Sequence, residues 1–231
     1  MTKHIGIVAC SSEGAALCYR TICLEGKEFL GAFNHPEISM HTFSLGLFID
    51  ALEDDNWEGV AELMLRSAHK LKQAGADFLI CPDNTIHQAL PMVIPKSPLP
   101  WMHIAEEVAN EATKQNLKRL LILGTTMLMN GPVYMQKLDK VGIGHMTPDE
   151  KRKKKISNII FQELVLGEIS ESSRRFYSET INEYKKQGCD GVVLGCTEIP
   201  LLVQQEHSSL KILDSTRILA RAALEAAVKD D

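Results

Sequence analysis

The stretch "GADFLICPDNT", residues 75 to 85, is the part of the sequence from which the fold can be argued. It opens with a glycine, continues through the apolar run Phe78 to Cys81, and ends in polar side chains that begin with Asp83. Continuous rather than alternating apolarity indicates a strand covered on both faces, as in a parallel α/β sheet. Ligands bind beyond the carboxyl ends of such strands, so the residues from Asp83 onward are candidates for a functional site.

An amphipathic segment precedes this glycine. It opens at Asp55-Asn56-Trp57, and its apolar residues fall on one stripe of a helix: Val60, Leu63, Met64 and Leu71. Gly75 then ends the helix as a left-handed C-cap would.

The same order of features recurs later in the chain. A second helix is expected from Ser170 to Gln187, and the stretch "GCDGVVLGCTE" follows it from Gly188. Placing Gly75 on Gly188 without gaps puts Asp77 on Asp190 and Asp83 on Cys196. A second pair, "IVACSS" at 7–12 and "LILGTT" at 121–126, supports the register. The chain therefore reads as two similar α/β halves. The expected strands are residues 4–9, 78–81, 120–123, 192–194 and 211–213.

Composition narrows the class of protein. The chain has 231 residues, of which 45% are hydrophobic and 24% charged, and its net charge is −5. This mild acidity argues against a nucleic-acid or membrane-surface binder, and the basic run 151–155 is interpreted as a solvated helix start. No apolar stretch reaches the roughly 18 residues of a membrane span, and residues 1–4 lead directly into a strand-like run without room for a signal peptide. A cytoplasmic protein is expected.

The cysteines show no metal-binding pattern. There are six, at positions 10, 18, 23, 81, 189 and 196, with no CxxC pair and no zinc spacing. They are expected to be free thiols in a reducing compartment, with no metal site.

Several motifs together resemble the aspartate/glutamate racemase family, which is cofactor-independent. They are "NTIH" at 84–87, "LILGTT" at 121–126, "IIFQELVLGEI" at 159–169, "GCTEIPLL" at 195–202 and "DST" at 214–216. The resemblance implies two similar three-layer α/β domains with parallel sheets, related by a pseudo-two-fold axis, with the active site in the interdomain cleft. Residues 1–105 with 208–231 would form the first domain and residues 106–207 the second. A homodimer is expected, with no cofactor.

The resemblance also implies a chemistry. Two family cysteines flank the substrate's α-carbon, and one removes a proton while the other returns one to the opposite face. This chain keeps the second as Cys196 and has Asp83 in the first position, while Cys81 would lie deeper in the sheet and is the lesser alternative. An ordinary aspartate, with a pKa near ~3.9, is a weaker base than a thiolate, but burial or a nearby thiolate would raise its pKa. The prediction is an isomerase that racemises or epimerises an amino acid, with Cys196 and Asp83 as the proton carriers.

Three alternatives stay open. Asp83 could merely cap the following turn, and Cys196 could then act alone in a maleate-type isomerase or malonate-type decarboxylase. The chain could be an inactive relative that binds a small acid. Cys196 could also be a core thiol.

Supporting roles follow from position. The family binds the α-carboxylate and amine with polar groups at strand ends, here Ser11, Ser12, Asn84, Thr85, Thr125, Thr126, Thr197 and Glu198. Each hydroxyl could equally be a helix cap, and His87 is interpreted as supporting the site from behind. The basic residue that holds a distal carboxylate in aspartate racemases is matched here by Val165, a frequent threonine is Leu128, and residues 41–52 contain no arginine. A substrate less acidic than aspartate is therefore expected.

Overall fold

The computed structural model describes residues 2–229, which form two compact units. The first consists of the described residues of Met1–Ile104 and Thr216–Asp231, and the second is Ala105–Ser215. The first crossing between units is one residue from the expected boundary. Residues 208–215, which we expected in the first domain, instead belong to the second, because the last strand of the chain pairs with a strand of that unit.

The order of elements alternates strands and helices. The strands are β1 (Ile5–Ala9), β2 (Ile38–Thr42), β3 (Phe78–Ile80), β4 (Arg119–Leu123), β5 (Gly144–Met146), β6 (Gly191–Leu194) and β7 (Lys211–Asp214). The α-helices are α1 (Ser12–Glu25), α2 (Lys27–Leu30), α3 (Leu45–Glu53), α4 (Trp57–Gln73), α5 (Leu90–Val93), α6 (Ile104–Lys114), α7 (Thr126–Asn130), α8 (Met135–Lys140), α9 (Glu150–Gln162), α10 (Glu171–Lys186), α11 (Ile199–Leu202) and α12 (Ser215–Val228). Short 3₁₀ helices are η1 (Thr85–Ala89), η2 (Ile94–Lys96), η3 (Leu164–Leu166) and η4 (Gln205–His207).

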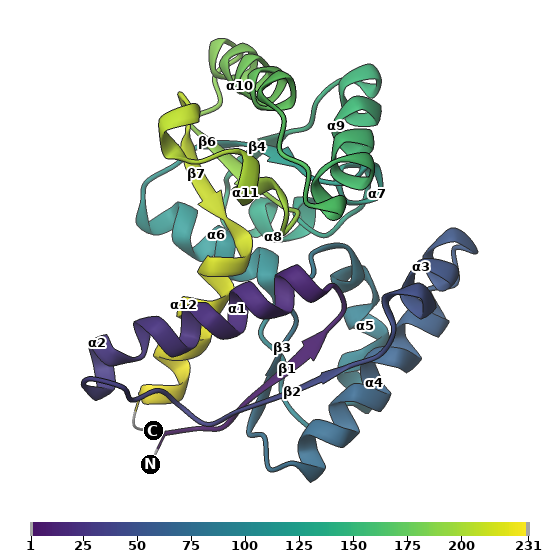
Figure 1. Ribbon diagram of the computed structural model, residues 1–231, viewed down its shortest axis with the longest axis vertical. Helices are drawn as coiled ribbons and strands as arrows, with labels where there is room; N and C mark the ends of the chain where they lie inside the picture. The colour runs from purple at the N-terminus through teal and green to yellow at the C-terminus, as the bar shows by residue number, and fades with distance from the viewer. Residues whose placement is uncertain (1, 230–231) are drawn as a thin grey trace. The chain divides into compact units, whose positions relative to one another are not determined.

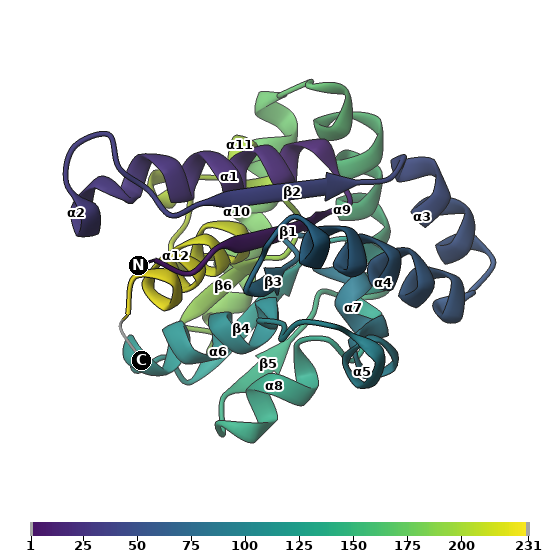
Figure 2. The same ribbon diagram turned by 90° about the horizontal axis from the view of Figure 1, so that it is seen from below.

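The sheet of the first unit has the order β2-β1-β3 among the described residues, and every pairing is parallel. Alternate residues of β1 pack on opposite faces of the sheet. Val8 packs in a core cluster with α4 and α5, whereas Ile5 and Ile7 pack in another cluster with α1 and α12. Figure 1 shows these layers, with α1 and α12 on one side of the strands and α4 on the other, and Figure 2 shows the three strands running alongside one another. The first unit is therefore a three-layer α/β structure.

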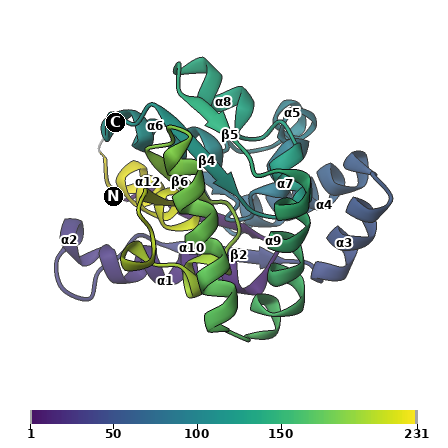
Figure 3. The same ribbon diagram turned by 90° about the horizontal axis from the view of Figure 1, so that it is seen from above.

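The sheet of the second unit has the order β5-β4-β6-β7 within residues 2–229, and it is also parallel. Leu121 and Leu123 of β4 pack in one core cluster with residues of α9, α10 and α11. Figure 3 shows α9 and α10 side by side over β4 and β6. In both units the first strand lies at the centre, between the second and third strands of that unit, so the two sheets share one strand order at their centres.

The repeat extends to individual hydrogen bonds. Gly75 and Gly188 both have φ of 93°, the left-handed conformation that glycine adopts without steric cost. Two residues after each glycine, an aspartate accepts from the backbone at the start of the central strand. Asp77 Oδ2 accepts from His4 N at 2.7 Å, and Asp190 accepts from Lys118 N at 2.7 Å and Arg119 N at 2.9 Å.

The expected strands and helices are present, and two strands were missed. β2 and β5 are edge strands of their sheets, and their side chains are mostly half-buried or exposed. Without burial on both faces they lack the continuous apolar run by which the other strands are recognised. No helix within the described part of the chain is long and apolar enough to cross a membrane.

Candidate active site

The second unit brings five of the predicted site residues to one edge of its sheet. Thr125 and Thr126 follow β4, while Cys196, Thr197 and Glu198 follow the adjacent strand β6. Cys196 is half-buried, and Thr197 and Glu198 are each 5% exposed. Cys196 Sγ donates a hydrogen bond to Glu198 Oε2 at 2.9 Å. A thiol that can reach a ligand is thus hydrogen-bonded to a buried carboxylate.

Two glycines allow these strand ends to approach each other. A Cβ on Gly195 would lie 2.6 Å from Leu128 Cδ2 and 3.0 Å from Leu123 O, and one on Gly124 would lie 2.7 Å from the same Leu128 atom. Gly195 N donates to Leu123 O at 2.7 Å. The glycine of "GCTE" is therefore required by packing, and Leu128 is buried over both turns.

The first unit gathers the other predicted residues in the same way. Ser11 and Ser12 follow β1, and Asp83, Asn84 and Thr85 follow its neighbour β3. Asp83 and Thr85 are half-buried and Asn84 is buried. The N-cap position of η1 is Asn84 rather than Asp83.

The ring of His87 is hydrogen-bonded to the backbone just before this turn. Its Nε2 donates to the Cys81 carbonyl at 2.9 Å, and its ring centroid lies 4.7 Å from that of His103. The bond ties η1 back to the end of β3 and so fixes the turn that carries Asp83.

Cys81 lies in a different environment from Asp83. It is completely buried, and burial, followed by the charge of Asp83, raises the pKa of its thiol well above the usual value. A thiol that ionises so reluctantly is poorly suited to removing a proton, whereas the Asp83 side chain is partly exposed.

Two of the predicted binding residues are helix caps. Ser11 Oγ accepts from Gly14 N at 3.3 Å, and Thr125 Oγ1 accepts from Leu128 N at 3.2 Å. Thr126 is held differently, since its Oγ1 lies 3.5 Å from the Lys153 carbonyl and its N–H points to Ser157 Oγ. The helix starts that follow both central strands thus repeat one another.

The polar groups at the junction of α9 and α10, and Tyr177 of α10, were not predicted from the sequence. Glu163 accepts from Ser170 Oγ at 2.9 Å and Ser173 Oγ at 2.6 Å. Tyr177 is fully buried, and burial, then the charges of Cys196 and Glu163, raise its pKa well above the usual value. A tyrosine on the buried stripe of an amphipathic helix is a signal for such a group, because its hydroxyl requires a partner. Val165, by contrast, is 46% exposed.

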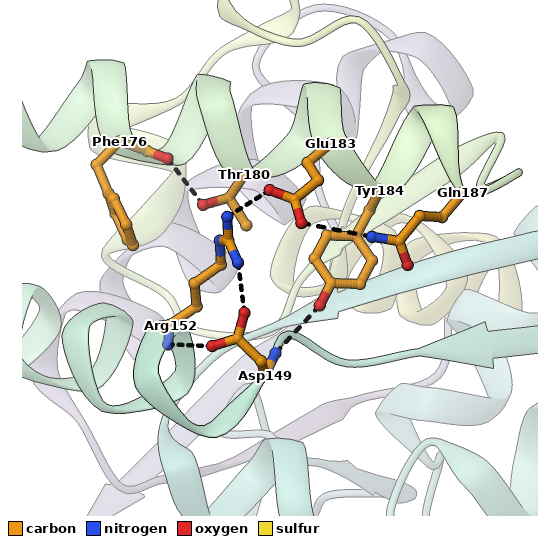
Figure 4. A network of polar contacts seen from close by, with 7 residues as sticks. All are labelled: Asp149, Arg152, Phe176, Thr180, Glu183, Tyr184 and Gln187. Carbon is orange, nitrogen blue, oxygen red and sulfur yellow. Dashed lines mark hydrogen bonds and ion pairs between the residues drawn. The ribbon is translucent and has the colours of Figure 1, made fainter.

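A second polar network joins the N-terminal end of α9 to the C-terminal end of α10 (Figure 4). The Arg152 guanidinium pairs with Asp149 and Glu183, and Asp149 N donates to the Tyr184 hydroxyl at 3.1 Å. Hydrogen bonds from Arg152 hold the pKa of the exposed Asp149 carboxyl below its usual range. The basic run at the start of α9 is thus partly engaged within the protein.

No group of three His, Cys, Asp or Glu side chains that could hold a metal ion occurs in residues 2–229.

Comparison with known proteins extends these observations. The family model for Asp/Glu/Hydantoin racemase matches residues 32–223. A crystal structure of a Yersinia pestis protein assigned to the Asp/Glu racemases is 32% identical, with a TM-score of 0.91, and the match covers 98% of this chain and 100% of that one. An aspartate racemase homologue from Pyrococcus horikoshii OT3 is 28% identical, with a TM-score of 0.87, over 99% of this chain and 100% of that chain.

A relative that is named for its activity has a lower sequence identity to this chain. The broad specificity amino-acid racemase RacX of Bacillus subtilis strain 168 is 21% identical over 201 residues, which are 86% of each chain. With a family model matched over most of its length and two α/β units of the same fold, the chain belongs to the Asp/Glu/Hydantoin racemase family of amino-acid racemases.

Proposed function

We propose that this racemase inverts the α-carbon of an amino acid by a two-base mechanism without a cofactor, with Cys196 and Asp83 as the proton carriers. The observation that carries the proposal is the half-buried Cys196 thiol after β6, hydrogen-bonded at 2.9 Å to the buried Glu198 carboxylate. A thiol with a carboxylate beside it can give up a proton and be reset, as general acid–base catalysis requires.

The proposed step balances as follows. The Asp83 carboxylate takes the α-proton from one face of the substrate, and the bonding pair stays on the α-carbon as a carbanion stabilised by the adjacent carboxylate. The S–H bond of Cys196 breaks, and its proton forms the new C–H bond on the opposite face. The enzyme is left with a protonated Asp83 and a Cys196 thiolate. Glu198, beside the sulfur, is positioned to pass a proton between Cys196 and solvent.

The two proton carriers are chemically different, so the rates of the forward and reverse reactions should also differ. A carboxylate starts as a weaker base than a thiolate, since their ordinary pKa values are about 3.9 and 8.5. We therefore propose that turnover starting from the enantiomer deprotonated by Asp83 differs in rate from turnover starting from the other.

The residues of the segment 159–169 favour a substrate side chain that is not a carboxylate. In the segment 159–169, matched to the helix that carries a cation in aspartate racemases, no lysine or arginine is present. Instead, the Glu163 carboxylate is held there by two serine hydroxyls. A second carboxylate near Glu163 would be repelled, whereas a neutral or hydroxylated side chain would not.

The test is proton NMR in deuterated water with a panel of L- and D-amino acids, following loss of the α-proton signal. We expect exchange with at least one amino acid that is not aspartate, loss of exchange from one enantiomer in Asp83→Asn and from the other in Cys196→Ala, and no racemisation in either variant. Equal forward and reverse turnover after Asp83→Ala would contradict the two-base assignment, and faster racemisation of aspartate than of any neutral amino acid would contradict the substrate assignment.

The remaining outcomes point to the competing functions. Decarboxylation or cis–trans isomerisation that depends on Cys196 alone would favour the related lyase or isomerase chemistry. Binding without exchange would favour an inactive small-acid-binding protein. We also propose a homodimer in the cytoplasm, which light scattering of the purified protein and fractionation of the source cells would check.

A further inference from the structure

Tyr177 is unusual among the hydroxyl-bearing residues of α10. Its side chain is fully buried, and its hydroxyl has no hydrogen-bond partner among residues 2–229. The other hydroxyls of the helix all have partners: Ser172 with Ser170, Ser173 with Glu163, Ser178 with the His207 carbonyl, Thr180 with the Phe176 carbonyl, and Tyr184 with Asp149 N. A buried hydroxyl without a hydrogen-bond partner destabilises the folded protein, so we expect this group to gain a partner in another state of the protein.

The surroundings of this hydroxyl indicate that partner. Cys196 packs against the core cluster that contains Tyr177, together with Ile199 and Leu202 from the helix after Cys196. The charged groups that act on the hydroxyl are Cys196 and Glu163, and both raise its pKa in addition to burial. Tyr177 therefore stays protonated and can act as a donor at any working pH.

The two acidic neighbours of the Tyr177 hydroxyl are held differently, and neither is hydrogen-bonded to it. Glu163 Oε2 accepts from Ser170 and Ser173, which hold the carboxylate at the junction of α9 and α10. Cys196 Sγ donates a hydrogen bond to Glu198, and a neutral thiol sulfur is a weak acceptor. Once the sulfur has lost its proton, it becomes a charged acceptor, and charge-assisted hydrogen bonds are the strong ones.

We propose that the Tyr177 hydroxyl donates a hydrogen bond to Cys196 Sγ in its thiolate form, and thereby stabilises the charge that arises when Cys196 protonates the substrate. The inference rests on the proposed function, in which Cys196 gives up that proton. The Tyr177 O–H bond stays intact throughout, and the electron pair of the broken S–H bond stays on sulfur. Tyr177 is thus a positioning residue that acts through Cys196.

The test measures the ionisation of Cys196 directly, without substrate. The native full-length chain is treated with iodoacetamide between pH 6 and 10, and the rate at Cys196 is read by peptide mass spectrometry. Because a hydrogen bond to a charged group shifts a pKa by about one unit, Tyr177→Phe should move the midpoint upward and slow alkylation at pH 7.5 by about tenfold.

Tyr184→Phe is the matched control. Tyr184 lies seven residues further along the same helix, and its hydroxyl is used in the network of Figure 4. This variant should lower the melting temperature and leave the alkylation profile of Cys196 unchanged, whereas Tyr177→Phe should melt no lower than the wild type.

Two results would overturn the inference. One is an alkylation midpoint that is the same in Tyr177→Phe and the wild type, or that moves equally in Tyr184→Phe. The other is a melting temperature of Tyr177→Phe below that of Tyr184→Phe, which would assign Tyr177 a purely structural role. Neither readout needs racemase activity, so a failed exchange experiment with a shifted midpoint would contradict the proposed function alone.

Discussion

The hydrogen bond between Cys196 and Glu198 joins two acids that lie two residues apart after β6. When the thiol ionises, two negative charges face each other in a site that is largely buried. Like charges at such a distance disfavour the second ionisation, so Glu198 opposes the thiolate that Tyr177 is proposed to stabilise. The balance between these residues decides how readily the sulfur gives up and regains its proton.

Replacing Glu198 by glutamine separates charge from hydrogen bonding. Glutamine retains an oxygen that can accept from the thiol but removes the negative charge, so the pKa of Cys196 should fall. We expect alkylation of Cys196 at pH 7 to be about tenfold faster in Glu198→Gln than in the wild type. The pH dependence of iodoacetamide labelling measures this, with the exposed Glu206→Gln as control. Unchanged or slower labelling would show that the Glu198 charge does not act on the sulfur.

The residues predicted from sequence were those that stand at the ends of recognisable strands. Cys196, Glu198, Thr125 and Asp83 do follow central or neighbouring strands. The contact between Cys196 and Glu198 could not be predicted, because it depends on the tight turn that Gly195 permits. Tyr177 was missed for another reason: it comes from a helix, and only tertiary packing brings it near the sulfur.

At the scale of elements, the left-handed glycine and the aspartate after it act as one connection between a helix and its sheet. Gly75 reverses the chain after α4, and Gly188 does so after α10, each at φ of 93°. Asp77 and Asp190 then fix the start of the neighbouring strand through backbone N–H groups. The same pair of glycine and aspartate thus fixes the start of the central strand in both units, β1 in the first and β4 in the second.

Alanine at either glycine should destabilise the protein to a similar extent. An L-residue in the left-handed region is strained, and we expect Gly75→Ala and Gly188→Ala each to lower the free energy of unfolding by about 1–2 kcal/mol. Urea denaturation measures it. Gly46→Ala is the control, since Gly46 lies in α3 with no close contact below 3.6 Å and should gain about 0.5–1 kcal/mol. A loss at Gly46 comparable to that at Gly75 would contradict the argument.

Which elements could be predicted follows from how each is buried. The central strands β1, β4 and β6 are nearly continuous apolar runs, because helices cover both faces of the sheets. β2 and β5 are sheet edges with exposed side chains, and their sequences, "ISMHT" and "GHM", carry no such run. The helix starts at Asn56 and Ser170 could be predicted because the side-chain chemistry of a helix start is local.

At the scale of the molecule, the chain passes from the first unit to the second near residue 104 and returns near residue 216. The second unit is one continuous segment with its own four-stranded sheet within the described residues. The first is completed only by α12, whose Leu219, Ala220 and Ala223 are buried against β1 and β3. The sequence did not predict which unit contains residues 208–215, because an apolar run indicates a strand but not the sheet in which that strand pairs.

The two units should therefore behave differently when cut from the chain. A fragment of residues 104–215 should unfold cooperatively in urea with a stability of about 5 kcal/mol, since it contains a complete core. A fragment of residues 1–104, which lacks α12, should show no cooperative transition. Circular dichroism across a urea titration distinguishes them, and a non-cooperative 104–215 fragment would show that the second unit depends on the first.

The hydrogen bonds from the starts of β1 and β4 to Asp77 and Asp190 can form only late in the synthesis of each unit. His4 and Asp77 are 73 residues apart, and Arg119 and Asp190 are 71 apart, so each central strand leaves the ribosome long before its last partner. At about 5–20 residues per second, that interval is roughly 4–15 seconds. For this time β1, and later β4, each present an apolar strand with an open edge in the nascent chain. Translation thus exposes the same vulnerable intermediate twice, once for each half of the repeat.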